Sequence, residues 1–311
     1  MYYYLNDMLR PISTLKISQE SIAKLMINGY NFLEDIQNNK ESHKYLTDKE
    51  LKHLNDVPKT VEIIHLFNKM NKKEIILIPS KNLNIILDRG FQCGTITELC
   101  GAMGSGKSQI CFQASVAVQL NKRYGGLNGK VVYIDTRDGF SSLRVTDIIQ
   151  GYRNRYKNLS LNNECILKSI AVFSPQTVTE LYDTIENIVK LVKKNPEVRL
   201  LIVDSLSHLI QFQTDSWKRT QSYFYILKLL RELSLSNIVI IVTNEMKNQL
   251  HNEIKNFQLV SSGGEVTANR MHRRLMLASI KQNQFAAKII KSSLRRITSM
   301  TFQITSDGIE D

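Results

Sequence analysis

The stretch of residues 101–108, Gly-Ala-Met-Gly-Ser-Gly-Lys-Ser, constrains this chain more than any other part of its sequence. It matches G-x-x-x-x-G-K-[ST] at every fixed position, and the glycines of that pattern let backbone N–H groups surround phosphate oxygens. The β-branched residues 95–99 before it predict a strand, and residues 109–120 after it predict a helix. Because the N-terminus of a helix favours an anion, we expect a phosphate-binding loop rather than a glycine-rich turn without a ligand.

The side chains at the end of this loop indicate a nucleotide with Mg²⁺. Lys107 can reach the β- and γ-phosphates, and the Ser108 hydroxyl can ligate the metal. A carboxylate that holds the hydration shell of the metal is also needed. Asp204 follows the apolar residues 200–203 and fits that role, the alternative being an acid that only caps the strand. The predicted nucleotide-binding residues of the loop are Gly101, Ala102, Met103, Gly104, Ser105, Gly106, Lys107, Ser108 and Gln109.

The charge of the chain favours polyanionic partners. There are 41 Lys and Arg residues against 29 Asp and Glu, a formal net charge of +12, which points to nucleic acid first and an anionic membrane surface second. The four cysteines show neither C-x-x-C spacing nor a zinc-binding pattern, so we expect reduced thiols. The first residues carry no secretory signal and no apolar run could span a bilayer, so we expect an intracellular protein without a membrane partner.

Strands and helices alternate along most of the chain, which predicts an α/β fold with a mostly parallel sheet and crossover helices. Predicted strands cover 130–135, 170–173, 200–204 and 238–242. Predicted helices start at the cap Thr177 and at Trp217. The first has a buried stripe of Leu181, Ile185, Ile188, Val189 and Val192, and the second an inward face of Tyr223, Ile226, Leu227, Leu230 and Leu233. Residues 244–262 are polar and are predicted to form a mobile loop, followed by three strands at about 273–277, 286–291 and 300–305. Near the N-terminus, apolar residues at helical spacing predict a small helical domain, with Ser18 capping a helix that Asn28 and Gly29 end.

Several segments together resemble the eukaryotic RecA/RadA-type recombinase family, and within it most closely the C-type recombinase paralogue. The segments that carry the resemblance are Thr97-Glu98-Leu99-Cys100-Gly101-Ala102, Gly106-Lys107-Ser108-Gln109, Gly125-Gly126-Leu127-Asn128-Gly129, Tyr133-Ile134-Asp135-Thr136 and Leu200-Leu201-Ile202-Val203-Asp204-Ser205. The resemblance runs from about residue 81 to residue 311 and is weaker over residues 22–36. It implies a RecA-like P-loop ATPase core at 81–311, a linker at 68–80 and a helix-hairpin-helix-like domain at 1–67.

This sequence departs from the family pattern at catalytic positions. The family has Asp-Thr-Glu with a catalytic glutamate, where this chain has Arg137, and an Asn-Gln sensor pair where it has Asn244 and Glu245. An arginine cannot accept a proton from water, and Glu245 near a triphosphate would be repelled unless a cation or Arg137 lies between them. Asp138, one position further, is the alternative carboxylate. With Lys107 and Asp138 as the candidate catalytic residues, we expect ATP binding with weak or absent hydrolysis.

The resemblance also implies further binding residues. Arg144 matches the position that stacks on adenine, and Asn244 the position that senses the γ-phosphate, with Asn269 where a histidine is common in the same relay. DNA-binding loops are expected at about 211–220 and 246–262. Their candidate DNA-binding residues are Trp217, Lys218, Arg219, Lys247 and Lys255. Inward packing of Trp217 at the start of its helix is the alternative.

Two other sequence features bear on assembly. The linker offers Phe67-Asn68-Lys69-Met70 where the family has the Phe-x-x-Ala segment that joins neighbouring subunits, so we do not expect long homopolymers. The Arg273-Arg274 and Arg295-Arg296 pairs predict exposed cationic strand edges that deter aggregation rather than a DNA site.

The resulting hypothesis is an ATP-binding recombinase paralogue that acts in homologous recombination, double-strand-break repair and meiosis. It would assist assembly of the main recombinase on single-stranded or branched DNA, together with other paralogue subunits, in the nucleus and secondarily the cytoplasm. The alternatives are a catalytically degenerate scaffold subunit that uses ATP as a structural clamp, and an active DNA-stimulated ATPase that uses Asp138. A P-loop helicase or unrelated RecA-core ATPase would require the agreement at Gly125-Gly126 to be accidental.

Overall fold

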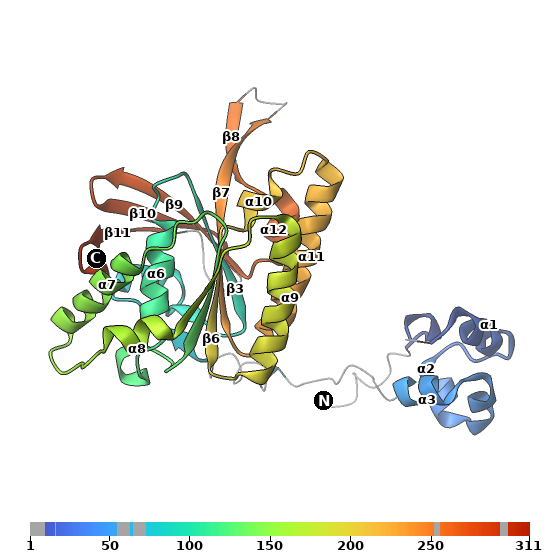
Figure 1. The fold of residues 1–311 in the computed structure, drawn as a ribbon. Coiled ribbons are helices and arrows are strands. Elements are labelled where there is room, and N and C mark those ends of the chain that lie inside the picture. Colours follow the sequence, from blue (N-terminus) through green and yellow to red (C-terminus); the bar gives the residue numbers. More distant parts are fainter. Residues whose placement is uncertain (1–9, 16, 55–62, 65–72, 252–255, 293–297) are drawn as a thin grey trace. The chain divides into compact units, whose positions relative to one another are not determined.

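The computed structural model describes residues 10–15, 17–54, 63–64, 73–251, 256–292 and 298–311, without the side chains of residues 52–53 and 247–260. The chain divides into two compact units, Met1–Asn71 and Lys72–Asp311 (Figure 1). Within the described ranges, no helix combines the length and hydropathy needed to cross a bilayer. The predicted domain boundaries at residues 67 and 80 stay predictions, and Phe67 to Met70 lie outside the described residues.

The small unit is built from short helices around a compact apolar cluster. Its elements are η1 (Ile12–Thr14), α1 (Gln19–Ile27), α2 (Leu33–Asn38), η2 (Lys40–Tyr45) and α3 (Asp48–Leu54). Its buried side chains are Ile12, Ile22, Leu25, Leu33, Ile36 and Leu54. Ser18 caps α1 by accepting a hydrogen bond from the Ser21 amide, and Asn28 ends the helix, as predicted. Glu50 accepts hydrogen bonds from the amides of Ser18 and Thr47, which lower its pKa to about 2.

The large unit is organised by one ten-stranded sheet with the order β12-β11-β10-β9-β3-β7-β6-β4-β5, in which β8 pairs with β7. Neighbouring strands in the part of the sheet formed by β9, β3, β7, β6, β4 and β5 are parallel. In the part formed by β9, β10, β11 and β12, neighbouring strands are antiparallel. The strands of this sheet are β3 (Thr95–Gly101), β4 (Lys130–Asp135), β5 (Ile170–Phe173), β6 (Val198–Asp204), β7 (Val239–His251), β8 (Asn256–Ser261), β9 (Arg273–Lys281), β10 (Gln284–Ser292), β11 (Ser299–Thr305) and β12 (Gly308–Glu310). This is the predicted α/β fold, a RecA-like core.

Helices cover both faces of the sheet, and the apolar strands show why (Figure 1). Successive residues of a strand point to opposite faces, so strands of only Leu, Ile and Val require apolar cover on each side. Leu200 and Ile202 pack with α6 and α7, whereas Leu201 and Val203 pack with α9 and α11. The covering helices are α5 (Lys81–Ile86), α6 (Lys107–Ala117), α7 (Ser142–Arg155), α8 (Asn163–Lys168), α9 (Val178–Lys194), α10 (Leu206–Ile210), α11 (Ser216–Ser234) and α12 (Gly264–Arg270).

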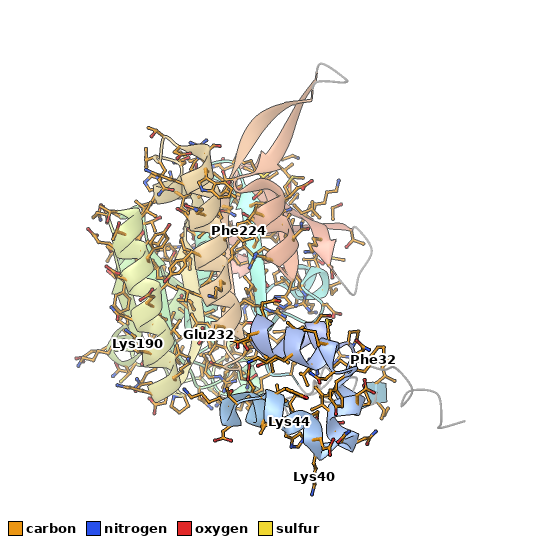
Figure 2. All side chains as sticks on the ribbon, turned by 90° about the vertical axis from the view of Figure 1, so that its right-hand side faces the viewer. Phe32, Lys40, Lys44, Lys190, Phe224 and Glu232 are labelled. Atoms are coloured by element: carbon orange, nitrogen blue, oxygen red, sulfur yellow. The ribbon has the colours of Figure 1, made fainter. Side chains whose placement is uncertain are left out.

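Helix α9 and helix α11 agree closely with their predicted faces. Thr177 caps α9 by accepting a hydrogen bond from the Glu180 amide, and the predicted buried stripe of α9 is the observed one. On the outer side, Lys190 of α9 and Glu232 of α11 point away from the sheet (Figure 2). A small two-stranded sheet of β1 (Ile75–Ile76) and β2 (Phe91–Gln92) precedes β3 in the sequence.

Two predictions about the C-terminal half were wrong. Most of the described residues between 244 and 262 form strands and not a loop, because β7 continues to His251 and pairs antiparallel with β8, from Met246 opposite Ser261 to His251 opposite Asn256. The Arg273-Arg274 pair is not exposed either. Arg273 is only 3% exposed and donates a hydrogen bond to the carbonyl of Gly90 over 3.2 Å. Arg274 forms an ion pair with the fully buried Glu98. Arg295 and Arg296 lie outside the described residues.

Candidate nucleotide-binding site

The glycine-rich loop joins the end of β3 to the start of α6, as its sequence predicts. Gly104 and Gly106 have φ angles of 75° and 90°, which side-chain-bearing residues rarely adopt. A Cβ on Gly106 would lie 2.9 Å from Cδ1 of Ile304, and one on Gly101 would lie 2.4 Å from the carbonyl oxygen of Leu277. Only glycines therefore allow the loop to close against the sheet with its amides free to face an anion.

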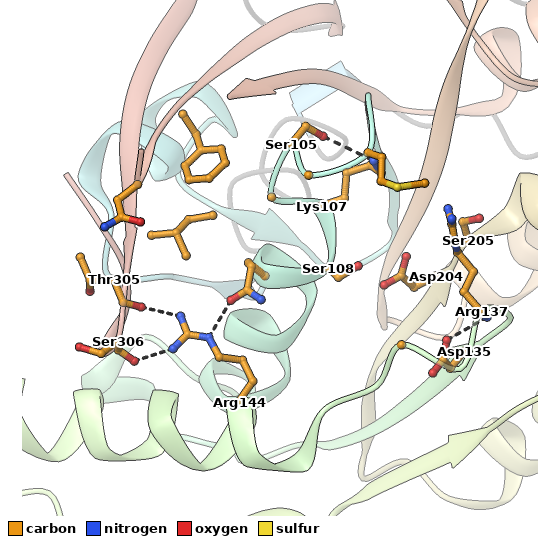
Figure 3. Close-up of a pocket in the computed structure, with 18 residues that line it drawn as sticks. Ser105, Lys107, Ser108, Asp135, Arg137, Arg144, Asp204, Ser205, Thr305 and Ser306 are labelled. Atoms are coloured by element: carbon orange, nitrogen blue, oxygen red, sulfur yellow. Dashed lines mark hydrogen bonds between the residues drawn. The ribbon is translucent and has the colours of Figure 1, made fainter. Parts of the chain in front are cut away.

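Lys107 lies inside the loop that precedes it (Figure 3). Its Nζ donates hydrogen bonds to the carbonyls of Gly101 and Ala102 over 2.9 and 2.8 Å, and burial lowers the pKa of the ammonium. Phosphate oxygens would be stronger acceptors for this group than neutral carbonyls, because both partners would then be charged. The position suits a lysine that turns from the loop to the phosphates of a ligand.

Acidic side chains end the two neighbouring strands on the other side of the cavity. Asp135 of β4 and Asp204 of β6 are register partners, and both are buried. Oδ2 of Asp204 accepts a hydrogen bond from the Tyr133 hydroxyl over 2.7 Å, and Oδ1 accepts one from Thr243. Asp135 accepts hydrogen bonds from the amides of its own loop, so it orders residues 137–140.

The donor set around Asp204 fits Mg²⁺. Ser108 and Asp204 line the same cavity of about 650 Å³, as does the rest of residues 103–109 (Figure 3). Each carboxylate oxygen of Asp204 has one hydrogen bond and keeps lone pairs for metal-bound water. Among the described residues, no three His, Cys, Asp or Glu side chains form a metal-ligating cluster. Mg²⁺ in a nucleotide site is held by one or two protein oxygens together with phosphates and waters, so a hydroxyl and one acid suffice.

The two residues that depart from the family pattern form an ion pair with each other. Nη1 of Arg137, in the loop after β4, contacts Oε1 of Glu245 on β7. Their side chains are 32% and 25% exposed, and Arg137 lines the cavity. Gly101, the first loop residue, is the register partner of Glu245, which places this pair beside the phosphate-binding loop. The positive charge at the expected position of the water-activating group is thus neutralised by the carboxylate at the position of the sensor.

Two predicted residues are not brought into the cavity. Oδ1 of Asp138 accepts a hydrogen bond from the Gln176 side chain over 3.4 Å, and Asp138 is exposed and does not line the cavity. Asn244 is fully buried, and its Nδ2 donates to Oε1 of Glu98 over 2.6 Å. Their predicted roles in hydrolysis and in nucleotide binding therefore stay predictions. Asn269 is exposed on α12 and lies outside this cavity.

Arg144 on α7 forms a wall of the cavity. Its guanidinium donates to the carbonyls of Thr305 and Ser306, each over 2.6 Å, and to Oε1 of Gln109 over 2.7 Å (Figure 3). These bonds fix the plane of the guanidinium, and a fixed plane can stack on a base. Burial lowers its pKa, although an arginine stays charged at neutral pH.

Sequence reasoning did not find the part of the cavity that comes from the C-terminal strands. Asn283, Phe285, Ile304 and Thr305 line it, as does Ser306. No local signal marks these residues, because they reach the loop only through the pairing of β9 with β3, of β10 with β9 and of β11 with β10. Tyr133 and Thr243, which support Asp204, were missed because only the pairing of β4 and β7 with β6 brings them to it.

The predicted DNA-binding residues lie at the start of α11 and on the β7–β8 hairpin. Trp217 is 67% exposed, so its predicted alternative of inward packing is wrong. Lys218 is exposed beside it, whereas Arg219 donates to the carbonyls of Gln213 and Thr214 and holds the preceding loop. Lys247 lies on β7, and its side chain is outside the described part, as is all of Lys255.

The fold and this cavity define a RecA-like protein with a phosphate-binding P-loop. Comparison with known families agrees, because the Rad51 family model matches residues 71–311, well over half of the chain. The chain therefore belongs to the Rad51 family. As a member it is a RecA-type protein of DNA recombination and repair, in a family that binds DNA and ATP and that is typically Mg²⁺-dependent.

A substitution in the ion pair tests its position at the phosphates. In Glu245→Gln the Arg137 guanidinium loses its carboxylate partner, so it can pair with a phosphate. We expect ATP to bind about three- to tenfold more tightly, because a charge-assisted hydrogen bond replaces an internal one. Equilibrium titration with a fluorescent ATP analogue and Mg²⁺ measures this. Lys107→Ala should abolish binding in both backgrounds, and weaker binding by Glu245→Gln alone would contradict the geometry.

Proposed function

We propose that this chain is an accessory recombinase paralogue that holds ATP without appreciable hydrolysis. In this role it assists assembly of the main recombinase on single-stranded DNA, as one subunit of a paralogue complex. The sequence resemblance to the C-type paralogue and the membership of the Rad51 family support this role. We extend the proposal to double-strand-break repair, to meiosis and to the nucleus, on the strength of the same resemblance.

The Arg137–Glu245 ion pair is the observation that carries the proposal. General-base catalysis of hydrolysis requires a carboxylate that accepts a proton from the attacking water. A guanidinium has no lone pair for that proton, and it is always charged. Because the sensor position carries Glu245, the two residues that depart from the family pattern neutralise each other's charge. ATP in such a pocket serves as a clamp.

The competing function is a DNA-stimulated ATPase that uses Asp138. The carboxylate of Asp138 lies within hydrogen-bond distance of the Gln176 side chain and does not line the cavity. Hydrolysis through Asp138 would require the loop after β4 to rearrange. Asp138→Asn separates the two functions, since it should leave nucleotide turnover unchanged if ATP is a clamp.

The test is steady-state ATP hydrolysis with single-stranded DNA for a set of matched variants. Arg137→Glu alone would place a carboxylate opposite Glu245, so the informative variant is the double change Arg137→Glu with Glu245→Gln. A general base contributes about 10²- to 10⁴-fold to a rate, so we expect the double variant to exceed the native chain by about 10² or more. The hydrolysis rate of the native chain should equal that of Lys107→Ala.

Rapid hydrolysis by the native chain that Lys107→Ala abolishes would contradict the clamp. If Asp138→Asn abolished it too, the ATPase that uses Asp138 would be the correct function. Binding of ATP by Asp138→Asn and by the double variant, measured in parallel, shows whether a change in turnover reflects a change in nucleotide binding.

We also propose that the start of α11 contributes to the DNA-binding surface. Trp217 and Phe212 are 67% and 69% exposed, and the exposed Lys218 follows Trp217. An exposed indole can stack on any base, and a neighbouring ammonium can contact a phosphate, which together favour single strands without sequence preference. Helix α11 and the β7–β8 hairpin belong to the same large unit, so both predicted loops can act on one strand.

Trp217 is the single tryptophan of the chain, so its fluorescence reports directly on this surface. We expect this fluorescence to be quenched when an oligothymidine binds. Lys218→Ala should lower the affinity for the oligothymidine, and it should reduce the salt dependence of the binding constant by about one phosphate contact. Trp217→Phe, followed by anisotropy of labelled DNA, should weaken binding less than Trp217→Ala does. Unchanged fluorescence at saturating DNA would remove this segment from the DNA site.

A further inference from the structure

A second, basic pocket of about 490 Å³ lies at the opposite end of β3 from the phosphate-binding loop. Its floor is His272, whose backbone amide and ring both bond to Ile96 near the start of β3. Ile96 and Gly101 are five positions apart along the strand, a distance of roughly 16 Å. The described residues that line the pocket are Arg231, Asn269, Arg270, Met271, His272, Lys291 and Ser292. None of these lining residues is acidic.

The ring of His272 has a defined tautomer. Its Nδ1 accepts a hydrogen bond from the Ile96 amide over 2.9 Å, so Nδ1 carries no proton. Burial, followed by the charge of Arg231, lowers the pKa of His272 to about 4, so the ring is neutral at physiological pH. The single proton of the neutral ring must therefore lie on Nε2, which makes Nε2 a donor.

Arg231 on α11 contacts that same nitrogen. Its Nη1 is in contact with Nε2 of His272, and a guanidinium can only donate. The contact therefore joins two hydrogen-bond donors that have no acceptor between them. An oxygen that carries negative charge would accept from both groups and convert this unfavourable contact into two charge-assisted hydrogen bonds.

In the described part of the chain, the groups around this contact add positive charge, and none accepts a hydrogen bond from Arg231 or from Nε2 of His272. Lys291 donates to the carbonyls of Ala268 and Asn269 over 2.7 and 3.2 Å, which holds its ammonium at the wall of the pocket. Arg270 lies over the ring of Phe224, 4.5 Å from its centroid, on the outer side of α11 (Figure 2). Glu98 on β3 and Glu232 on α11 are engaged in ion pairs, with Arg274 and with Lys193.

We propose that this pocket is a phosphate-binding site, in which an oxyanion accepts hydrogen bonds from Nε2 of His272 and from the Arg231 guanidinium. In this proposal, the fork of the guanidinium and the ring N–H each donate to an oxygen of one phosphate group. The phosphate belongs either to the backbone of a nucleic acid or to a small phosphorylated ligand, since both present the same oxygens. This site is separate from the ATP cavity, and it does not depend on whether ATP is hydrolysed.

The experiment follows the six histidines of the full-length chain by nitrogen NMR after selective labelling, with the His272 signal assigned from His272→Gln. Inorganic phosphate is titrated at constant ionic strength against chloride. We expect a saturable shift of the Nε2 signal of His272, and an apparent affinity that Arg231→Ala lowers by about tenfold or more. Lys190→Ala removes one positive charge from the outer face of α9 and should leave the affinity unchanged.

A single-stranded oligonucleotide added to the phosphate-saturated chain distinguishes the two sources. Displacement of phosphate assigns the site to a nucleic-acid backbone, and retention of phosphate assigns it to a small phosphorylated ligand. Repeating the titration with Lys107→Ala should give the same shift, because the ATP cavity lies at the other end of β3. The absence of a saturable shift, or equal affinities for the native chain and Arg231→Ala, would overturn the proposal.

Discussion

Parallel pairing of β3, β7, β6 and β4 determines where the phosphate-binding loop, the two acids and the ion pair of the ATP cavity lie. The carboxyl ends of parallel strands meet at one edge of a sheet, so the residue that follows each apolar run is delivered to the same place. Gly101 ends β3, Asp135 ends β4 and Asp204 ends β6, with Glu245 on β7 beside Gly101. The cost of burying their polar atoms is offset by hydrogen bonds such as those of Tyr133 and Thr243 to Asp204.

Within this frame, Arg137 and Glu245 alter the chemistry without altering the fold. Each residue alone would place an uncompensated charge beside the phosphates, positive in one case and negative in the other. Together they form a neutral pair that spans the loop after β4 and the strand β7. Strand β7 continues into the β7–β8 hairpin, so the pair physically joins the nucleotide cavity to one of the two segments expected to bind DNA. A bound nucleotide that contacts Arg137 would therefore change the contact between Arg137 and Glu245 on β7, the strand that continues into this hairpin.

The sequence predicts those parts of the structure that depend on local patterns. The apolar run at 200–203, the cap at Thr177 and the buried stripe of α9 each carry a signal within a few residues, and the structure confirms them. The phosphate-binding loop is predicted because its motif, strand and helix are contiguous. The error at residues 244–262 arose because polar residues in an extended hairpin lack the alternation that marks a half-buried strand.

Long-range contacts explain the rest of what sequence reasoning missed. Arg273 is a surface residue by composition, and the Gly90 carbonyl that accepts its hydrogen bond lies 183 positions earlier in the chain. Arg144 obtains its partners from Thr305 and Ser306 at the end of β11. The two-donor contact of Arg231 with His272 likewise depends on the packing of α11 against the turn before β9, which no local pattern encodes.

The central claim is that the cavity holds ATP and does not consume it. The most direct test is to incubate the purified chain with Mg²⁺, ATP and single-stranded DNA for many hours, remove free nucleotide, and identify by chromatography which nucleotide remains on the protein. The Arg137–Glu245 pair predicts intact ATP in nearly every loaded molecule. Recovery of mainly ADP, lost when Lys107 is replaced by alanine, would contradict it.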